Sequence, residues 1–184
     1  MINNENIKKY IEFIISEIGY LSIQKECFFM IKKLIEKDIE SNIFLKQCLY
    51  ENFIYTYIIK LFRILEKPQN PHKDDTYLYL IYKFLELPLE KFNKIYNLNS
   101  YKHLKDFRHK RIGHLTEQTI NIAWKELDEI LQYTQDLANI ALYKIEEITI
   151  TDWQIPLKLI TDAELKKIPW ININFENGRW GFHN

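Results

Sequence analysis

Apolar residues recur every three or four positions through most of the chain, which is the period of a helix with one buried face. The first two runs are Ile7, Ile11, Ile14 and Ile18, and then Ile23, Cys27, Met30 and Leu34. Gly19 lies between them, and glycine weakens a helix interior. The pattern predicts two N-terminal helices with a break or kink at Gly19.

A longer periodic run extends from Phe44 to Leu65 and predicts one long third helix. A polar connection follows at residues 67–76, where Pro68 and Pro71 cannot continue a helix. This connection is expected to be an exposed loop.

Shorter helices and a final long one are expected next. The apolar spacing from Tyr77 to Phe84 predicts one, and Pro88 suits the first position of another. Ser100 is the expected N-cap of a helix that runs toward Gly113, and Thr116 is the expected N-cap of the last helix. The apolar stripe of that last helix is Ile120, Ala123, Leu127, Ile130, Thr134, Leu137, Ala141 and Ile145. Residues 1–150 are therefore predicted to form an all-α bundle of five to six helices.

The character of the chain changes after Ile150. Three of the four tryptophans follow it, at positions 153, 170 and 180. Thr161 and Glu164 have the spacing of a capping box for one short helix, and residues 170–182 are expected to be irregular or extended. Residues 151–184 are thus predicted to be an aromatic C-terminal arm, which is packed either on the bundle or on a partner.

Composition excludes several functions. Neither a P-loop nor a dinucleotide fingerprint can be written with the 4 glycines, so no nucleotide cofactor bound in that way is expected. The 25 basic residues balance 25 acidic ones, which leaves no overall attraction to polyanions. Cys27 and Cys48 lie in apolar runs and are interpreted as free buried thiols. Without a leader pattern or an apolar stretch of about 18 residues, a cytoplasmic protein with no membrane contact is expected.

Positive charge is concentrated between Tyr101 and Leu115. This segment holds Lys102, Lys105, Arg108, Lys110 and Arg111, one acid (Asp106), and three histidines (His103, His109 and His114). Such a cluster would attract a phosphate, although a solvated helix face with incidental histidines is the alternative. A metal site is not expected, because on one helix His103 and His114 would lie roughly 16 Å apart along the axis.

The stretch Asp106–His114 carries a more specific resemblance. It is similar to the R-x(4–6)-H signature of the HEPN superfamily (the higher eukaryotes and prokaryotes nucleotide-binding domain), and particularly to its abortive-infection branch. The matching positions are Arg108, His109, Lys110, Gly113 and His114. The long helix that ends at Leu65 and the loop after it are also similar, so the resemblance spans residues 5–148. His109 departs from the family pattern, which commonly has Asn or Asp there.

The resemblance implies a HEPN-like helical bundle and a metal-independent endoribonuclease that acts as a toxin or as an abortive-infection (phage-defence) effector. Arg108 and His114 would be catalytic. The supporting, phosphate-binding residues would be His109, Lys110, Arg111 and Lys105, while Tyr101 would stack an unpaired base. Arg108 and His114 are six residues apart and converge only if the helix loosens or if two chains combine their motifs.

Partners follow from the same resemblance. RNA is the expected substrate, a homodimer is implied, and a cognate antitoxin or a nucleotidyltransferase protein is a further candidate partner. The alternative is a non-catalytic HEPN-like module that binds RNA, a nucleotide or a protein. The departure at His109 and the aromatic arm favour this alternative.

Overall fold

The computed structural model of the chain describes the backbone of residues 6–38, 43–68, 77–109, 122–151, 153, 175–176 and 179–180. Side chains are described for residues 6–29, 51–68, 77–109, 122–151 and 153. The chain divides into two compact units, Met1–Thr151 and Asp152–Asn184.

Six helices make up the described part of the first unit, which confirms the prediction of an all-α bundle. They are α1 (Ile7–Asp38), α2 (Ile43–Leu65), α3 (Leu78–Phe84), α4 (Glu90–Asn97), α5 (Asn99–Phe107) and α6 (Trp124–Glu146). The described part of the second unit is a short antiparallel pair, in which β1 (Phe175–Glu176) aligns Phe175 with Trp180 of β2 (Arg179–Trp180).

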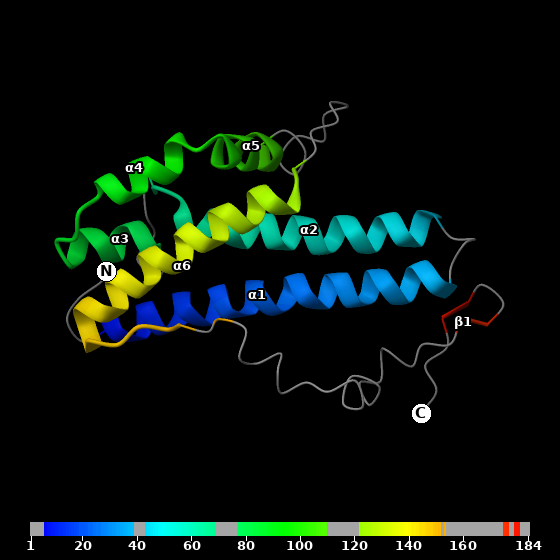
Figure 1. Ribbon diagram of the computed structural model, residues 1–184, viewed down its shortest axis with the longest axis horizontal. Coiled ribbons are helices and arrows are strands. Elements are labelled where there is room, and N and C mark those ends of the chain that lie inside the picture. The colour runs from blue at the N-terminus through cyan, green and yellow to red at the C-terminus, as the bar shows by residue number, and fades with distance from the viewer. Residues whose placement is uncertain are drawn as a thin grey trace. The chain divides into compact units, whose positions relative to one another are not determined.

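Helix α6 organises the bundle because it contacts all five other helices. The long helices α1 and α2 lie side by side (Figure 1). Of the short helices, α3 contacts α1 and α2 as well as α6, and α5 contacts α2 as well as α6. The buried stripe of α6 is the predicted one from Leu127 through Ala141. The central position of α6 explains why this stripe is mostly apolar, with Thr134 and Gln135 as its buried polar residues.

The N-terminal segment is one helix, so the predicted break at Gly19 is wrong. Helix α1 continues through Gly19, where an added Cβ would meet no heavy atom within 4 Å. Ile14 and Ile18 before the glycine, and Leu21 after it, are all buried. Each such side chain contributes about 1.5–3 kcal/mol, whereas one interior glycine costs about 1 kcal/mol. Packing on both sides therefore keeps the helix intact.

Three predicted helix starts also differ from the structure. Ala123 is extended (φ −83°, ψ 146°) and is the N-cap of α6, so a continuous helix capped by Thr116 is ruled out. Ser100 lies inside α5, where its hydroxyl is buried without a partner among the described residues, and Leu98 is the N-cap. Pro88 lies one residue before Leu89, the N-cap of α4, and is therefore not at the first helical position.

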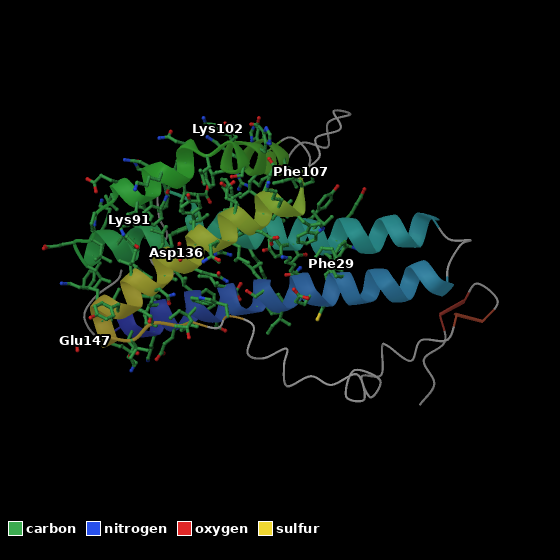
Figure 2. All side chains as sticks on the ribbon, viewed as in Figure 1. Phe29, Lys91, Lys102, Phe107, Asp136 and Glu147 are labelled. Carbon is green, nitrogen blue, oxygen red and sulfur yellow. The ribbon has the colours of Figure 1, made fainter. Side chains whose placement is uncertain are left out.

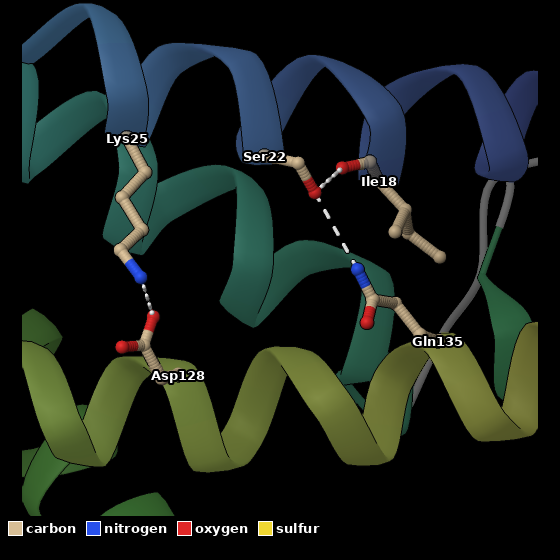
Figure 3. A network of polar contacts seen from close by, with 5 residues as sticks. All are labelled: Ile18, Ser22, Lys25, Asp128 and Gln135. Atoms are coloured by element: carbon tan, nitrogen blue, oxygen red, sulfur yellow. Dashed lines mark hydrogen bonds and ion pairs between the residues drawn. The ribbon is translucent and has the colours of Figure 1, made fainter. Parts of the chain in front are cut away.

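Two polar contacts link α1 to α6, one between partly exposed side chains and one between buried side chains (Figure 3). Lys25 Nζ lies 2.6 Å from Asp128 Oδ1. One turn earlier on α1, Gln135 Nε2 donates to Ser22 Oγ at 3.4 Å, and Ser22 Oγ donates to the Ile18 carbonyl at 3.2 Å. These contacts fix the register of the two helices, since a shift by one turn would leave the buried amide of Gln135 unpaired.

Two fully buried tyrosines differ in how their hydroxyls are satisfied. Tyr82 Oη donates to the Leu137 carbonyl of α6 at 2.9 Å. Tyr57 Oη has no hydrogen-bond partner in the part of the chain that the structure describes. Burial raises the pKa of both phenols. Both hydroxyls therefore remain protonated, and only that of Tyr82 regains the hydrogen bond it loses on leaving water.

Candidate functional site

Helix α5 carries the first half of the basic segment and is held against the bundle by a buried stripe. Tyr101, Leu104 and Phe107 are buried, and α5 contacts α2, α4 and α6. The positions between them are exposed, as are the two residues that follow Phe107: Lys102, His103, Lys105, Asp106, Arg108 and His109. The charged residues of this helix therefore form a solvent-facing surface.

Arg108 lies at the end of α5, and its guanidinium covers an aromatic ring of α2. Its Cζ atom is 4.9 Å from the centroid of the Phe62 ring. A cation at this distance from a ring face is attracted by about 0.5–1 kcal/mol at an exposed site. Arg108 is itself exposed, so Phe62 orients a guanidinium whose donors remain available to an anion.

The helix widens where the motif begins. Arg108 keeps helical angles (φ −56°, ψ −46°), and residues 108–109 form a π turn. Such turns change the angular phase of the residues that follow and often occur at functional sites. Arg108 and His114 would converge either if this helix loosens or if two chains combine their motifs. Lys110, Arg111, Gly113 and His114 lie outside the described residues, so their approach to Arg108 stays a prediction.

Tyr101 does not fit the role expected for it. Its side chain is 7% exposed, and its ring stacks on Phe62 with centroids 5.9 Å apart and an interplanar angle of 12°. The ring of Tyr96 packs against that of Tyr101, with ring centroids 5.2 Å apart. With its ring engaged by these neighbours, Tyr101 is a core residue that supports the ring under Arg108, and the prediction that it stacks an unpaired base is corrected.

His103 belongs to a structural contact that sequence reasoning missed. Its Nδ1 lies 2.6 Å from Glu126 Oε1. Glu126 Oε2 also accepts a hydrogen bond at 2.9 Å from the backbone N–H of Ala123, the N-cap of α6. The pKa of Glu126 is lowered, first by this backbone hydrogen bond and then by His103. The contact ties α5 to the first turn of α6 on either side of the motif.

A sequence signal for this contact exists, namely an acidic side chain at the third position of a helix, which is half of a capping box. It is visible only when the start of α6 is placed at Trp124.

The exposed cations of α5 continue onto α4. Lys91 and Lys94 are exposed on α4, as are Lys102, Lys105 and Arg108 on α5. We call these five residues the α4–α5 basic face. Lys102 projects away from α6, and Lys91 lies on the helix before it (Figure 2). None of the five forms an ion pair with another described residue.

Two carboxylates are exposed among the five cations, Glu90 on α4 and Asp106 on α5. The surface of residues 90–109 therefore carries an excess of three positive charges, although the whole chain is balanced.

Within residues 6–38, 43–68, 77–109 and 122–151, no group of three His, Cys, Asp or Glu side chains is arranged to hold a metal ion. No helix in these ranges is long and apolar enough to cross a membrane. Cys27 is a free, half-buried thiol whose pKa is raised by burial and by Glu26, and the side chain of Cys48 is not described.

The fold and the α4–α5 basic face define this chain as an all-α helical bundle with a local cationic surface. Comparison with known proteins adds no relative, because no family model, curated protein or solved structure matches the chain.

Proposed function

We propose that this protein is a metal-independent endoribonuclease of the HEPN type, which acts as a toxin or as an abortive-infection effector and works in the cytoplasm as a homodimer. The observation that carries the proposal is Arg108, an exposed guanidinium that is oriented by Phe62 at the point where α5 widens. It stands on a surface with an excess of three positive charges. A phosphodiester is the ligand such a surface attracts.

The proposed reaction is cleavage of a phosphodiester bond by the neighbouring 2′-hydroxyl, with His114 and Arg108 in named roles. The 2′-hydroxyl loses its proton to a base and its oxygen attacks the adjacent phosphorus. The bond between phosphorus and the 5′-oxygen then breaks, and that oxygen receives a proton. His114, with an ordinary pKa near 6.5, transfers one of these protons at neutral pH. The products are a 2′,3′-cyclic phosphate and a 5′-hydroxyl.

Arg108 has a separate role in this reaction. Negative charge develops on the non-bridging phosphoryl oxygens, and a planar guanidinium binds two of them at once. Lysine at this position would keep the charge but lose the paired donors. Arg108→Lys is therefore expected to retain RNA binding and to lose most of the cleavage rate. His109, Lys110, Arg111 and Lys105 would bind the flanking phosphates.

The test is cleavage of labelled tRNA and mRNA in EDTA by the full chain, by His114→Ala and by Arg108→Lys. We expect cyclic-phosphate ends with the parent protein and at least a hundredfold less cleavage with His114→Ala, since general acid–base catalysis contributes about 10²–10⁴-fold. His72→Ala, a histidine outside the motif, is the matched control and should cleave normally. Circular dichroism of each variant shows whether the bundle is intact.

The contrary outcomes are distinct. Equal cleavage by the parent and by a folded His114→Ala protein would refute the assigned chemistry. RNA that binds without being cut would replace the proposal with a non-catalytic HEPN-like module. Absence of both binding and cleavage would leave a protein-binding role toward an antitoxin or a nucleotidyltransferase. Light scattering tests the homodimer.

A further inference from the structure

The α4–α5 basic face extends beyond the motif, and this extension has no role in the reaction. Lys91 and Lys94 precede Arg108 by 17 and 14 residues and lie on a different helix. The bundle does not use their charges, since neither is paired with any residue that the structure describes. Charges gathered without internal partners point to an external anion.

We infer that the α4–α5 basic face binds the backbone of the RNA strand that flanks the scissile phosphate. The inference rests on the proposed function, because it is the RNA at Arg108 that brings a strand to α4. Helices α4 and α5 are 8 and 9 residues long, and only Leu98, in an extended conformation (ψ 141°), joins them. At 1.5 Å per residue they offer up to about 25 Å of surface, enough for several nucleotides.

The chemistry of this face favours contacts to phosphates over contacts to bases. Among the aromatic rings of the two helices, Phe92, Tyr101 and Phe107 are buried. Tyr96 is half-buried, and its ring packs against those of Phe92 and Tyr101. The exposed side chains include five long cations, Lys91, Lys94, Lys102, Lys105 and Arg108, on two consecutive helices. Cations bind a phosphodiester backbone without regard to sequence and release the counterions condensed on it. The α4–α5 basic face would therefore bind the strand without sequence preference, and the residues of the motif would determine where it is cleaved.

The number of cations sets the size of the effect. For a single strand, log K falls with log salt by about 0.7 per neutralised phosphate. If each of the five cations contacts one phosphate, the slope is about −3.5, and three contacts give about −2.1. The change of about 1.4 corresponds to a loss of about 25-fold in affinity at 0.1 M salt.

The experiment measures binding of a fluorescein-labelled 20-nucleotide oligouridylate to the full chain from 0.05 to 0.3 M salt. Lys91→Gln/Lys94→Gln is compared with Lys9→Gln/Lys144→Gln, which removes two exposed charges from α1 and α6. We expect the first variant to lose about 25-fold in affinity at 0.1 M salt and the slope to fall by about 1.4. The second variant should behave as the parent does.

Equal affinities and slopes in the two double variants would overturn the inference while leaving the proposed function standing, provided that the parent cleaves RNA. A parent protein that binds the oligomer through Lys91 and Lys94 but cuts no RNA would support the face and contradict the nuclease. In the cleavage assay, Lys91→Gln/Lys94→Gln should raise KM and leave kcat unchanged, because both lysines lie outside the motif. A lower kcat with an unchanged KM in Lys91→Gln/Lys94→Gln would also contradict the inference that this face binds the flanking strand.

Discussion

Tyr57→Phe is expected to stabilise this protein, although it removes a polar group from a fully buried side chain. Tyr57 lies at 0% exposure on α2, and its hydroxyl has no partner among the described residues. Leaving a buried hydroxyl unpaired costs about 1–3 kcal/mol. Phenylalanine retains the ring and its edge-on contact with Trp124 at 5.5 Å. We therefore expect the free energy of unfolding to rise by about 1 kcal/mol and Tm by about 2–4 °C.

Tyr82→Phe is the matched control, because Tyr82 is equally buried and its hydroxyl is paired. Removing the 2.9 Å hydrogen bond to Leu137 should cost about 0.5–1.5 kcal/mol and lower Tm. Thermal and urea unfolding followed by far-ultraviolet circular dichroism measures both variants. A loss of stability in Tyr57→Phe that equals the loss in Tyr82→Phe would refute the reasoning, since it would mean that the Tyr57 hydroxyl is satisfied.

Three further substitutions test other parts of the structure. Gly19→Ala should raise the free energy of unfolding by about 0.5–1 kcal/mol, because α1 is continuous there and the added methyl group meets nothing; a decrease would indicate a kink. Glu126→Ala should cost about 1 kcal/mol at pH 7, by loss of the hydrogen bond from Ala123.

The folded-state pKa of Glu126 is lowered from 4.5, so its contribution is present above pH 4.5 and is lost as the pH falls through the folded value. Urea unfolding curves of Glu126→Ala and of the parent should therefore differ at pH 7. They should coincide only at a pH below the folded-state pKa of Glu126. Phe62→Leu should weaken RNA binding by about 2–5-fold, the value of the lost cation–π contact to Arg108; unchanged affinity in a folded variant would contradict that role.

Local pattern was sufficient for the class of the fold. The apolar period from Phe44 to Leu65 predicts α2 to within one residue at its start. The predicted stripe of α6 is buried from Leu127 to Ala141, whereas Ala123 is exposed and Ile145 is half-buried. A helix that buries one face places apolar residues on that face every three or four positions. This period can be recognised from short stretches of sequence. The basic residues of α5 can also be recognised from a short stretch of sequence. They are exposed because the apolar residues between them are the ones that α5 buries.

Tertiary structure decided where helices begin and what each side chain touches. The sequence predicts a break at Gly19 because the cost of glycine in a helix depends on that residue alone. The packing that outweighs this cost comes from contacts of α1 with α2 and α6. A last helix that starts after Thr116 and one that starts at Trp124 would both present the same apolar stripe. The hydrogen bond from Ala123 to Glu126 marks the observed start, and the partner that also holds Glu126 is His103, 23 residues away.

The candidate site divides in the same way. The sequence by itself determined an all-α bundle and a basic segment with an R-x(4–6)-H motif, because both depend on residue types and short spacings. Only the tertiary structure placed Phe62 under Arg108, buried Tyr101 in the core and left Lys91 and Lys94 exposed on α4, which contacts α5. These relations depend on which faces of α2, α4 and α5 meet, and that is fixed by burial summed over the whole bundle rather than by any one segment.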